Sequence, residues 1–220
     1  MLEKKLISNL HNSTKRNYLK RMIDKKVNCM KIAKKYSTEY WDGNRRYGYG
    51  GYRYIPGRWK NVARKLIKDY NLKKGSKILD LGCGKSFLLY EMLLIEPELK
   101  IFGIDISSYA LKKAIKKKNL NLSKIDARKK LPYSDKQFDL VISLATLHNF
   151  ELFDLVRAIK EIERVGKKKF IMVESYRTDL ELFNLQCWAL TCETFFSKKE
   201  WIYLFKELKY QGDYEFIYFR

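Results

Sequence analysis

The segment that most constrains the fold of this chain is Ile78-Leu-Asp-Leu-Gly-Cys-Gly-Lys-Ser86. Its first residues are apolar and typical of a buried strand, and the glycine-rich turn after them leads into a helix-forming stretch that runs to Ile95. Gly82 and Gly84 allow the backbone to approach a ligand that a Cβ atom would keep away. A strand, a glycine-rich turn and a helix in this order indicate a ligand site at the carboxyl edge of a parallel sheet.

Strand and helix patterns alternate after residue 60, which predicts an α/β domain over residues 61–220. The predicted strands are Lys77–Leu81, Lys100–Asp105, a short strand near Ser123, Phe138–Ser143, Phe170–Glu174 and Tyr214–Phe219. The predicted helices are Asn61–Tyr70, Ser86–Ile95, Ser108–Lys118, Leu152–Arg164, Asp179–Glu193 and Ser197–Leu208. The basic runs Lys112–Lys118 and Lys167–Lys169 are expected to be solvated helix and loop faces.

Residues 1–60 have a different composition and are expected to form a cap on this domain. Apolar residues at three- and four-residue spacing predict an amphipathic helix near 15–35: Leu19, Met22, Ile23, Val27 and Met30. Residues 36–60 contain eight aromatic residues, five glycines and four arginines, which argues against a regular helix. We expect this segment to cover the ligand site, and a packed tyrosine-rich turn is the alternative.

Acidic residues follow the strands at a spacing that suits a nucleoside ligand. Asp105 ends the second predicted strand, where a carboxylate can accept hydrogen bonds from two ribose hydroxyls. Asp126 follows the short third strand, where a carboxylate can receive an adenine amino group. Asp80 precedes the glycine turn, where it would repel a pyrophosphate but suit an ammonium group. Because the turn also lacks the third glycine of the dinucleotide fingerprint, a nicotinamide cofactor is disfavoured.

The strand, turn and helix, the acids after them, and the segment Leu131-Pro-Tyr-Ser-Asp-Lys-Gln-Phe-Asp-Leu-Val-Ile-Ser143 together resemble the class I S-adenosylmethionine-dependent methyltransferase superfamily. The resemblance is closest to its small-molecule, quinone-biosynthesis-like type. It implies a Rossmann-like fold with a mostly parallel central sheet and helices on both faces. It also implies that the donor, S-adenosylmethionine, is bound by Asp80, Gly82, Cys83, Gly84, Asp105, Ile106, Asp126, Ala127 and Ser143. The family often has a third glycine where Ser86 stands, which makes this turn less permissive.

The acceptor of the methyl group is expected at the same edge of the sheet. His148 follows the fourth strand and is a candidate general base, because its unperturbed pKa of about 6.5 suits proton removal near neutrality. It could instead pack beneath the ligand. Other candidates for contact with the acceptor are Tyr49, Tyr52, Arg53, Arg58, Asn149, Glu174, Tyr176, Arg177 and Trp188. Aromatic rings can stack on an acceptor, and arginines can pair with a carboxylate or phosphate.

The charge balance leaves the class of acceptor open. The chain carries 46 basic and 25 acidic residues, a net charge of +21, which attracts polyanions. Most of the excess is lysine spread through the sequence, as a compositional bias would also produce. We therefore predict a small-molecule acceptor, anionic or sugar-linked, with an RNA methyltransferase as the alternative and a noncatalytic donor-binding module as a third interpretation. The oligomeric state stays open.

The remaining composition favours a cytoplasmic protein without a metal centre. The four cysteines include no C-x-x-C pair, and the two histidines, His11 and His148, are far apart in sequence. No apolar run approaches the roughly 20 residues of a membrane span, and residues 1–10 do not resemble a signal peptide.

Overall fold

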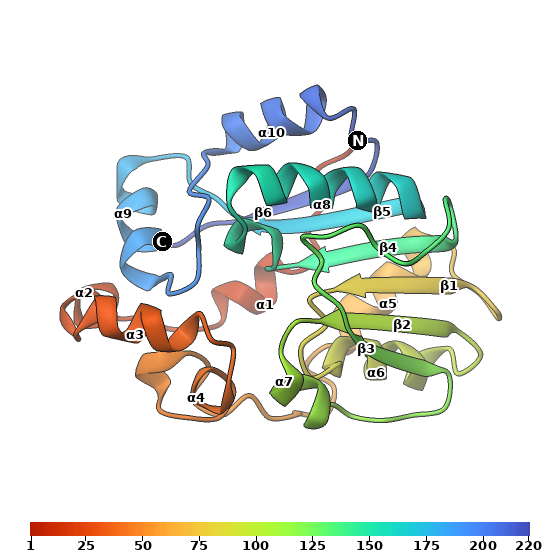
Figure 1. Cartoon of the computed structure of the whole chain (residues 1–220), viewed down its shortest axis with the longest axis horizontal. Helices are drawn as coiled ribbons and strands as arrows, with labels where there is room; N and C mark the ends of the chain where they lie inside the picture. Colours follow the sequence, from red (N-terminus) through yellow and green to blue (C-terminus); the bar gives the residue numbers. More distant parts are fainter.

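Six parallel strands form the centre of the molecule (Figure 1), and the computed structural model describes every residue from Met1 to Arg220. The strands are β1 (Lys77–Leu81), β2 (Lys100–Asp105), β3 (Leu120–Lys124), β4 (Phe138–Leu144), β5 (Gly166–Glu174) and β6 (Asp213–Ile217). Their order across the sheet is β3-β2-β1-β4-β5-β6. All carboxyl ends therefore meet at one edge, and the predicted Rossmann-like α/β fold is confirmed.

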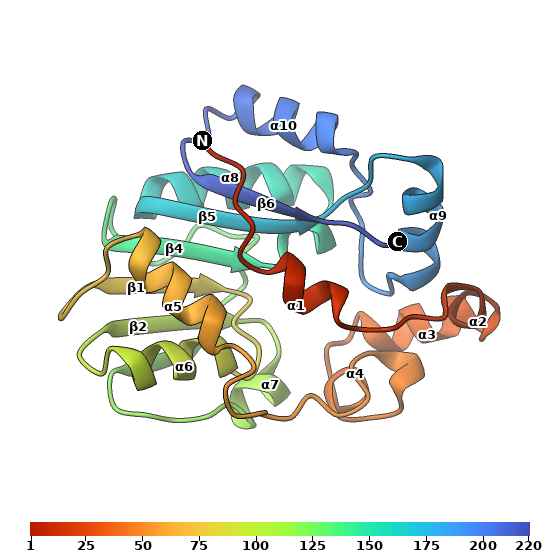
Figure 2. The same ribbon diagram turned by 180° about the vertical axis from the view of Figure 1, so that it is seen from behind.

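Helices cover both faces of the sheet and its carboxyl edge (Figures 1 and 2). They are α1 (Ser8–Asn12), α2 (Tyr18–Ile23), α3 (Lys26–Ala33), α4 (Thr38–Trp41), α5 (Lys60–Asp69), α6 (Phe87–Ile95), α7 (Ser108–Lys112), α8 (Leu152–Val165), α9 (Asp179–Trp188) and α10 (Lys198–Glu207), with 3-10 turns η1 (Arg45–Tyr47) and η2 (Leu147–Asn149). None of these helices has the length and apolar character needed to cross a bilayer.

Each face of the sheet has its own hydrophobic core. Side chains of α5 and α6 pack with Ile78 of β1 on one face. Side chains of α8 and α10 pack with Leu79 and Leu81 on the other. Successive strand residues point to opposite faces, so the apolar run of β1 serves both cores. The helices α2, α3, α4 and α9 instead lie beyond the carboxyl ends of the strands (Figure 1), where the ligand site is expected.

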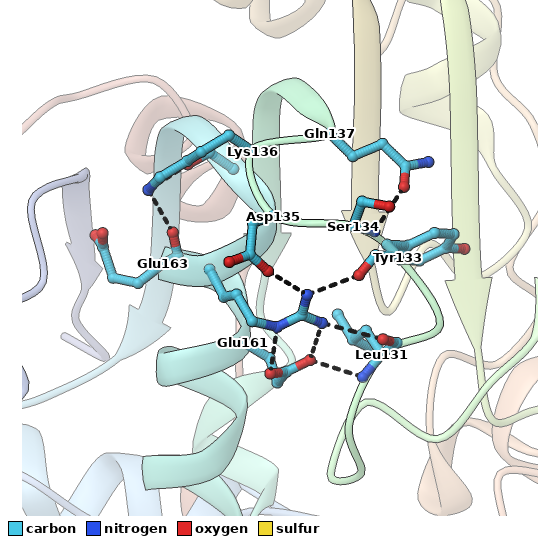
Figure 3. A network of polar contacts seen from close by, with 10 residues as sticks. Leu131, Tyr133, Ser134, Asp135, Lys136, Gln137, Glu161 and Glu163 are labelled. Atoms are coloured by element: carbon cyan, nitrogen blue, oxygen red, sulfur yellow. Dashed lines mark hydrogen bonds and ion pairs between the residues drawn. The ribbon is translucent and has the colours of Figure 1, made fainter.

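The loop before β4, which carries part of the family resemblance, is held to α8 by Arg164. The guanidinium of Arg164 pairs with Glu161 at 2.6 Å and with Asp135 at 2.9 Å. It also donates to the backbone oxygens of Leu131 and Tyr133, while Glu161 accepts the backbone N–H of Leu131 (Figure 3). These neighbouring carboxylates hold the pKa of Arg164 above its ordinary value. The loop lies at the amino end of β4, so these contacts stabilise the fold rather than the site.

The N-terminal segment differs from the single amphipathic helix predicted near 15–35. It forms α2 and α3, which are separated at Lys25, a residue in the left-handed region with φ of 45°. Leu19, Ile23 and Val27 are 61%, 80% and 67% exposed, so the apolar stripe does not pack on the main domain. Lys26 instead donates its ammonium group to backbone carbonyls at the end of α9. This tertiary contact fixes the start of α3, and a continuous helix is lost.

Six of the eight lysines in the two basic runs are exposed, as expected, but the secondary structure of the runs differs from the prediction. The predicted helix Ser108–Lys118 ends at Lys112, because the adjacent like charges that follow weaken a helix. Lys167–Lys169 lie within β5 rather than in a loop. Lys169 is only 4% exposed and pairs with Glu163 at 2.9 Å, which compensates its burial.

The first residues of the chain lie along the outer edge of β6. Glu3 forms a parallel bridge with Tyr214. Glu215 of β6 is 1% exposed, and its carboxylate accepts the backbone N–H groups of residues 6–8 at 2.7–3.0 Å. A buried carboxylate thus satisfies the free amides that begin α1. Through Glu215, the N-terminal segment is attached to the last strand of the sheet (Figure 2).

Candidate active site

The turn between β1 and α6 has a backbone that glycine adopts readily. Gly82 and Gly84 have φ of +83° and +54°. A Cβ atom on Gly82 would lie 2.0 Å from the Thr146 hydroxyl oxygen, and one on Gly84 would lie 2.9 Å from the Trp41 ring. Both positions therefore exclude larger residues for reasons of space as well as conformation.

Ser86 stands where the family often has a third glycine, and it keeps the conformation that glycine would adopt. Its φ is 61°, in the left-handed region, and the residue is 1% exposed. The hydroxyl donates to the backbone oxygen of Lys85 at 2.7 Å or to that of Ile115 at 3.0 Å. These hydrogen bonds satisfy the buried hydroxyl and offset the strain of the backbone. The substitution therefore leaves the shape of the turn intact.

Two buried carboxylates lie beside the turn. Asp105 accepts the backbone N–H of Gly84 at 2.8 Å and that of Ser107 at 2.7 Å. Asp80 is 5% exposed, and its Oδ1 has no hydrogen-bond partner. Burial, with a further contribution from the charge of Asp105, raises the pKa of Asp80 to about 8. A buried carboxyl oxygen without a partner indicates a place for a donor group from a ligand.

A cavity of about 590 Å³ lies at the carboxyl ends of β1, β4, β5 and β6. Its size is within the range of small-molecule sites, roughly 300–1,000 Å³. The predicted site residues that line it are Asp80, Gly82, Cys83, Gly84, Tyr49, Tyr52, Arg53, Arg58, His148, Asn149, Glu174 and Trp188. The fold thus brings together the residues expected for the donor's methionine end and most of those expected for the acceptor.

The aromatic side chains of residues 36–60 form one wall of this cavity. Trp41 lies against Gly84 and donates its Nε1–H to the Ser107 hydroxyl at 2.9 Å. The Tyr49 ring stacks on Trp41, with centroids 5.3 Å apart and planes 11° apart. The Tyr52 ring stacks on that of Phe87, the first residue of α6, with centroids 4.9 Å apart. The segment therefore lies over the glycine turn, as a cover would.

An ion pair fixes this cover to the main domain. The Lys85 ammonium lies 2.7 Å from both carboxylate oxygens of Asp42 and donates to the backbone oxygen of Tyr52 at 2.8 Å. The Tyr109 hydroxyl donates to Asp42 at 2.8 Å. The side chain of Lys85 is 5% exposed, so little solvent screens the pair. Residues 43–51, which include Tyr49, form a loop closed at both ends by these contacts.

His148 and Glu174 face one another in the wall formed by β5 and η2. The backbone N–H of Glu174 donates to Nδ1 of His148 at 3.2 Å, which assigns the proton of the neutral ring to Nε2. Nε2 lies 3.4 Å from Oε2 of Glu174. Burial lowers the pKa of His148 to about 3 and raises that of Glu174 to about 7. The histidine predicted as a base therefore has no free lone pair, and the carboxylate is better placed for that role.

Five residues predicted to hold the donor lie outside the cavity lining, and one of them is Asp105, whose carboxylate accepts the N–H of Gly84 in the adjoining turn. Asp126 pairs with Arg128 at 2.9 Å, an ion pair that the sequence did not suggest. Ala127 is buried, and Ile106 is 41% exposed. Ser143 is fully buried and donates its hydroxyl to the backbone oxygen of Leu81 at 3.3 Å, so it has no access to the cavity.

Two residues predicted for the acceptor also lie outside the lining. Tyr176 forms an isolated parallel bridge with Ser197, and Arg177 forms an ion pair with Glu181 at the start of α9. These contacts connect β5 to α9 and α10. Neither side chain lines the cavity, so neither is placed to contact an acceptor held there.

The sequence did not identify several other lining residues. Trp41 was counted only as one of many aromatics, and His11, Arg16 and Arg21 belong to the N-terminal segment. Their positions depend on contacts with β6 and α9, far away in sequence. Residues 1–35 carry eleven lysines and arginines against two acids, but this density does not indicate which part of the fold they contact.

Comparisons with known proteins agree with this geometry. A family model described as "methyltransferase domain" matches residues 72–212. The chain is 33% identical over 116 residues to the mitochondrial arginine-hydroxylase NDUFAF5 of Rattus norvegicus, which is 53% of this chain and 33% of that protein. It is 34% identical over 109 residues to the demethylmenaquinone methyltransferase of Staphylococcus carnosus, 47% of this chain and 44% of that protein. It is 32% identical over 117 residues to the ribosomal RNA small subunit methyltransferase C of Buchnera aphidicola, 50% of this chain and 32% of that protein.

The matched stretches therefore span less than half of each of these relatives. Among solved structures, an S-adenosylmethionine-dependent methyltransferase from Aquifex aeolicus superposes with a TM-score of 0.51 at 22% identity, over 70% of this chain and 82% of that one. This likeness supports the fold. Because the family model covers most of the sheet and both cores, the chain belongs to the methyltransferase-domain family, within the class I S-adenosylmethionine-dependent methyltransferases.

Proposed function

We propose that the protein transfers a methyl group from S-adenosylmethionine to a small-molecule acceptor held in the cavity. The observation that carries this proposal is a cavity with aromatic walls. Trp41 and Tyr49 of the cover and Trp188 of α9 line a space of about 590 Å³ that also contains the glycine turn. A cavity of this size with aromatic walls suits a small acceptor, whereas a folded RNA needs a wide basic surface.

The residues at the end of β1 fit the donor. The unpartnered Oδ1 of Asp80 can accept a hydrogen bond from the ammonium group of the methionine moiety. Thr146 and Trp41 fill the space beside the α-carbons of Gly82 and Gly84 in this structure. Asp105 uses two of the roughly four hydrogen bonds that a carboxylate can accept, so it retains capacity for ribose hydroxyls. Asp105 is only 9% exposed, so we expect the cover to move when the donor enters.

When bound, S-adenosylmethionine supplies a methyl group attached to a positively charged sulfur. The protein's own contribution is to orient the acceptor and exclude water, which can supply several kcal/mol. Glu174 can take a proton from the acceptor, because its pKa of about 7 leaves a useful fraction ionised at neutral pH. The Nε2–H of His148 would orient the carboxylate. Asn149, Tyr52, Arg53 and Arg58 complete the walls.

An RNA acceptor is the alternative. The net charge of +21 favours it, and so does the similarity to a ribosomal RNA methyltransferase. A noncatalytic module that binds the donor is the third candidate.

Incubation with methyl-labelled donor and cell extract distinguishes these candidates. The extract is separated by ultrafiltration into small molecules and macromolecules, and the macromolecular fraction is tested with and without ribonuclease. We expect label in the small-molecule fraction. Label that ribonuclease releases from the macromolecular fraction would favour the RNA alternative. Donor binding without transfer to either fraction would favour the noncatalytic module.

A further inference from the structure

Three arginines surround the ring of Trp188 at one end of the cavity. The guanidinium carbons of Arg16, Arg21 and Arg45 lie 5.4, 4.5 and 5.1 Å from the centre of that ring. The three come from the linker before α2, from α2 itself and from η1, and all line the cavity together with Trp188. The fold therefore gathers three cations from separate segments around one aromatic side chain.

None of these arginines has a carboxylate partner within 4 Å. Arg21 donates to the backbone oxygens of Trp188 at 3.1 Å and of Arg45 at 2.8 Å. Arg16 bonds only to backbone oxygens and to the His11 ring, and its buried Nε has no partner. Arg45 donates to the backbone oxygen of Gly48. Elsewhere in the chain, Arg46, Arg128, Arg157, Arg164 and Arg177 each form an ion pair with an acid.

The charge of Arg45 disfavours the charges of Arg21 and Arg16. Burial, and then the charge of Arg45, lowers the pKa of Arg21 to about 10. Burial similarly lowers the pKa of Arg16, with a smaller contribution from Arg45. Arg16 and Arg21 are partly buried and Arg45 is exposed. Partly buried cations are normally paired, and the face of Trp188 compensates these charges only in part. An anion between these guanidinium groups would relieve both the burial and the repulsion.

We infer that Arg16, Arg21 and Arg45, gathered around Trp188, form a subsite that binds a carboxylate or phosphate group of the acceptor. This inference rests on the proposed function, since it assigns the acceptor a chemical class. Planar guanidinium groups form paired hydrogen bonds with such oxyanions. The charge of Arg16 also acts on the carboxyl of Glu174, so the subsite adjoins the proposed base. An acceptor anchored there by its anion would present its remaining atoms to Glu174.

The donor also carries a carboxylate, but its position does not suit this subsite. Its carboxylate and ammonium share one carbon, and the ammonium is assigned to Asp80 on β1. Trp188 lies beyond β5, which is two strands from β1 in the sheet, a separation of about 10 Å. Arg53 and Arg58 also line the cavity. The charge of Arg58 acts on Tyr52, which stacks on Phe87 just after the glycine turn, so Arg58 is a candidate for the donor carboxylate.

Anion binding by the intact chain tests the inference. Inorganic phosphate and, separately, acetate are titrated into protein saturated with S-adenosylhomocysteine at constant ionic strength, and binding is followed by calorimetry. Arg16→Gln and Arg45→Gln are compared with Arg64→Gln, which removes the same charge from an exposed position on α5. We expect the first two variants to weaken the preferred anion at least about tenfold, the loss typical of a charge-assisted hydrogen bond, and Arg64→Gln to leave it unchanged. The stronger response, to phosphate or to acetate, identifies the anionic group.

Two results would overturn the inference. One is equal anion binding by all three variants, with only a lower melting temperature for Arg16→Gln and Arg45→Gln, which would make the cluster structural. The other is a tenfold loss of S-adenosylhomocysteine affinity in the same two variants, which would assign the cluster to the donor. The titrations are repeated without S-adenosylhomocysteine. A wild-type protein that binds phosphate but no S-adenosylhomocysteine would count against the proposed function and not against the anion subsite.

Discussion

The backbone N–H of Gly84 donates to Oδ2 of Asp105 at 2.8 Å, so the turn after β1 and the end of β2 form one hydrogen-bonded unit. This contact explains why a carboxylate at Asp105 matters before any ligand arrives. It holds the glycine turn in the conformation that the donor would meet. The remaining lone pairs of the same carboxylate can then accept hydrogen bonds from ribose hydroxyls.

Replacing Asp105 with alanine is expected to weaken binding of S-adenosylhomocysteine about ten- to a hundredfold, because a charge-assisted hydrogen bond of roughly 1.5–3 kcal/mol is lost. Calorimetry measures the affinity. Circular dichroism and the melting temperature report whether the turn has unfolded. A folded variant with the affinity of the wild type would remove Asp105 from the donor site.

Donor binding is expected to release a proton from Asp80. The pKa of this carboxyl is raised to about 8, so it is mostly protonated in the free protein at pH 7. An ammonium group beside it favours the ionised form, so affinity should rise with pH between about 6 and 8, by up to roughly tenfold per unit. Calorimetry in two buffers of different ionisation enthalpy counts the protons released. Asp80→Asn should bind weakly without proton release, and equal release by this variant would contradict the assignment.

Turnover is expected to rise as pH increases through about 7, because Glu174 must be ionised to accept a proton and burial raises its pKa to that value. Glu174→Gln should lower kcat by roughly 10²–10⁴ if the acceptor must lose a proton. His148→Gln should retain more activity and the same pH midpoint, since the histidine acts through Glu174. A pH midpoint that disappears only in the His148 variant would restore the histidine as the base.

The cover should be most important for the acceptor. Tyr49 is 41% exposed and stacks on Trp41 at the glycine turn. Tyr49→Ala should therefore lower turnover much more than S-adenosylhomocysteine affinity. Tyr203→Ala on α10, where the tyrosine is 65% exposed, is the matched control and should change neither. If Tyr49→Ala lowered only the melting temperature, the cover would be a packing element.

Loss of the Lys85–Asp42 ion pair should release the cover. Lys85→Met leaves Asp42 without its cation and is expected to destabilise the fold by about 1–3 kcal/mol. This loss is smaller than that for breaking a fully buried ion pair, because the side chain of Asp42 is 27% exposed. Amide hydrogen exchange of residues 43–52 should accelerate more than that of β1. Uniform acceleration across the sheet would show that the pair contributes to global stability alone.

The sheet and the donor turn could be predicted from the sequence because their signals are local. The predicted bounds of β1 and β2 match the structure. The helix predicted from Ser197 is also present, and it begins with a capping box formed by Ser197 and Glu200. The cover was predicted from its composition alone. Its anchor was not, since Lys85 and Asp42 are 43 residues apart, and the place of Lys85 in the glycine turn does not indicate an acidic partner in the cover.

The acceptor end was less predictable because it depends on tertiary contacts. Asp126 was assigned to adenine by its position after a strand, but its neighbour Arg128 pairs with it. Arg16 and Arg21 reach Trp188 only because α2 is placed against α9, and no periodicity in residues 1–35 encodes that contact. Burial also places the pKa of His148 below that of Glu174, the reverse of their ordinary order. No sequence pattern indicates this burial.

The attachment of residues 6–8 to Glu215 has a consequence for how the site is made. Leu6 and Glu215 are 209 residues apart, so the start of the chain leaves the ribosome long before its partner exists. The central strands can pair during synthesis, but α1 and the arginines that follow it cannot reach their final positions until β6 has joined the sheet. Completion of the cavity therefore depends on β6, and a nascent chain in which only the central strands have paired still lacks the arginines around Trp188.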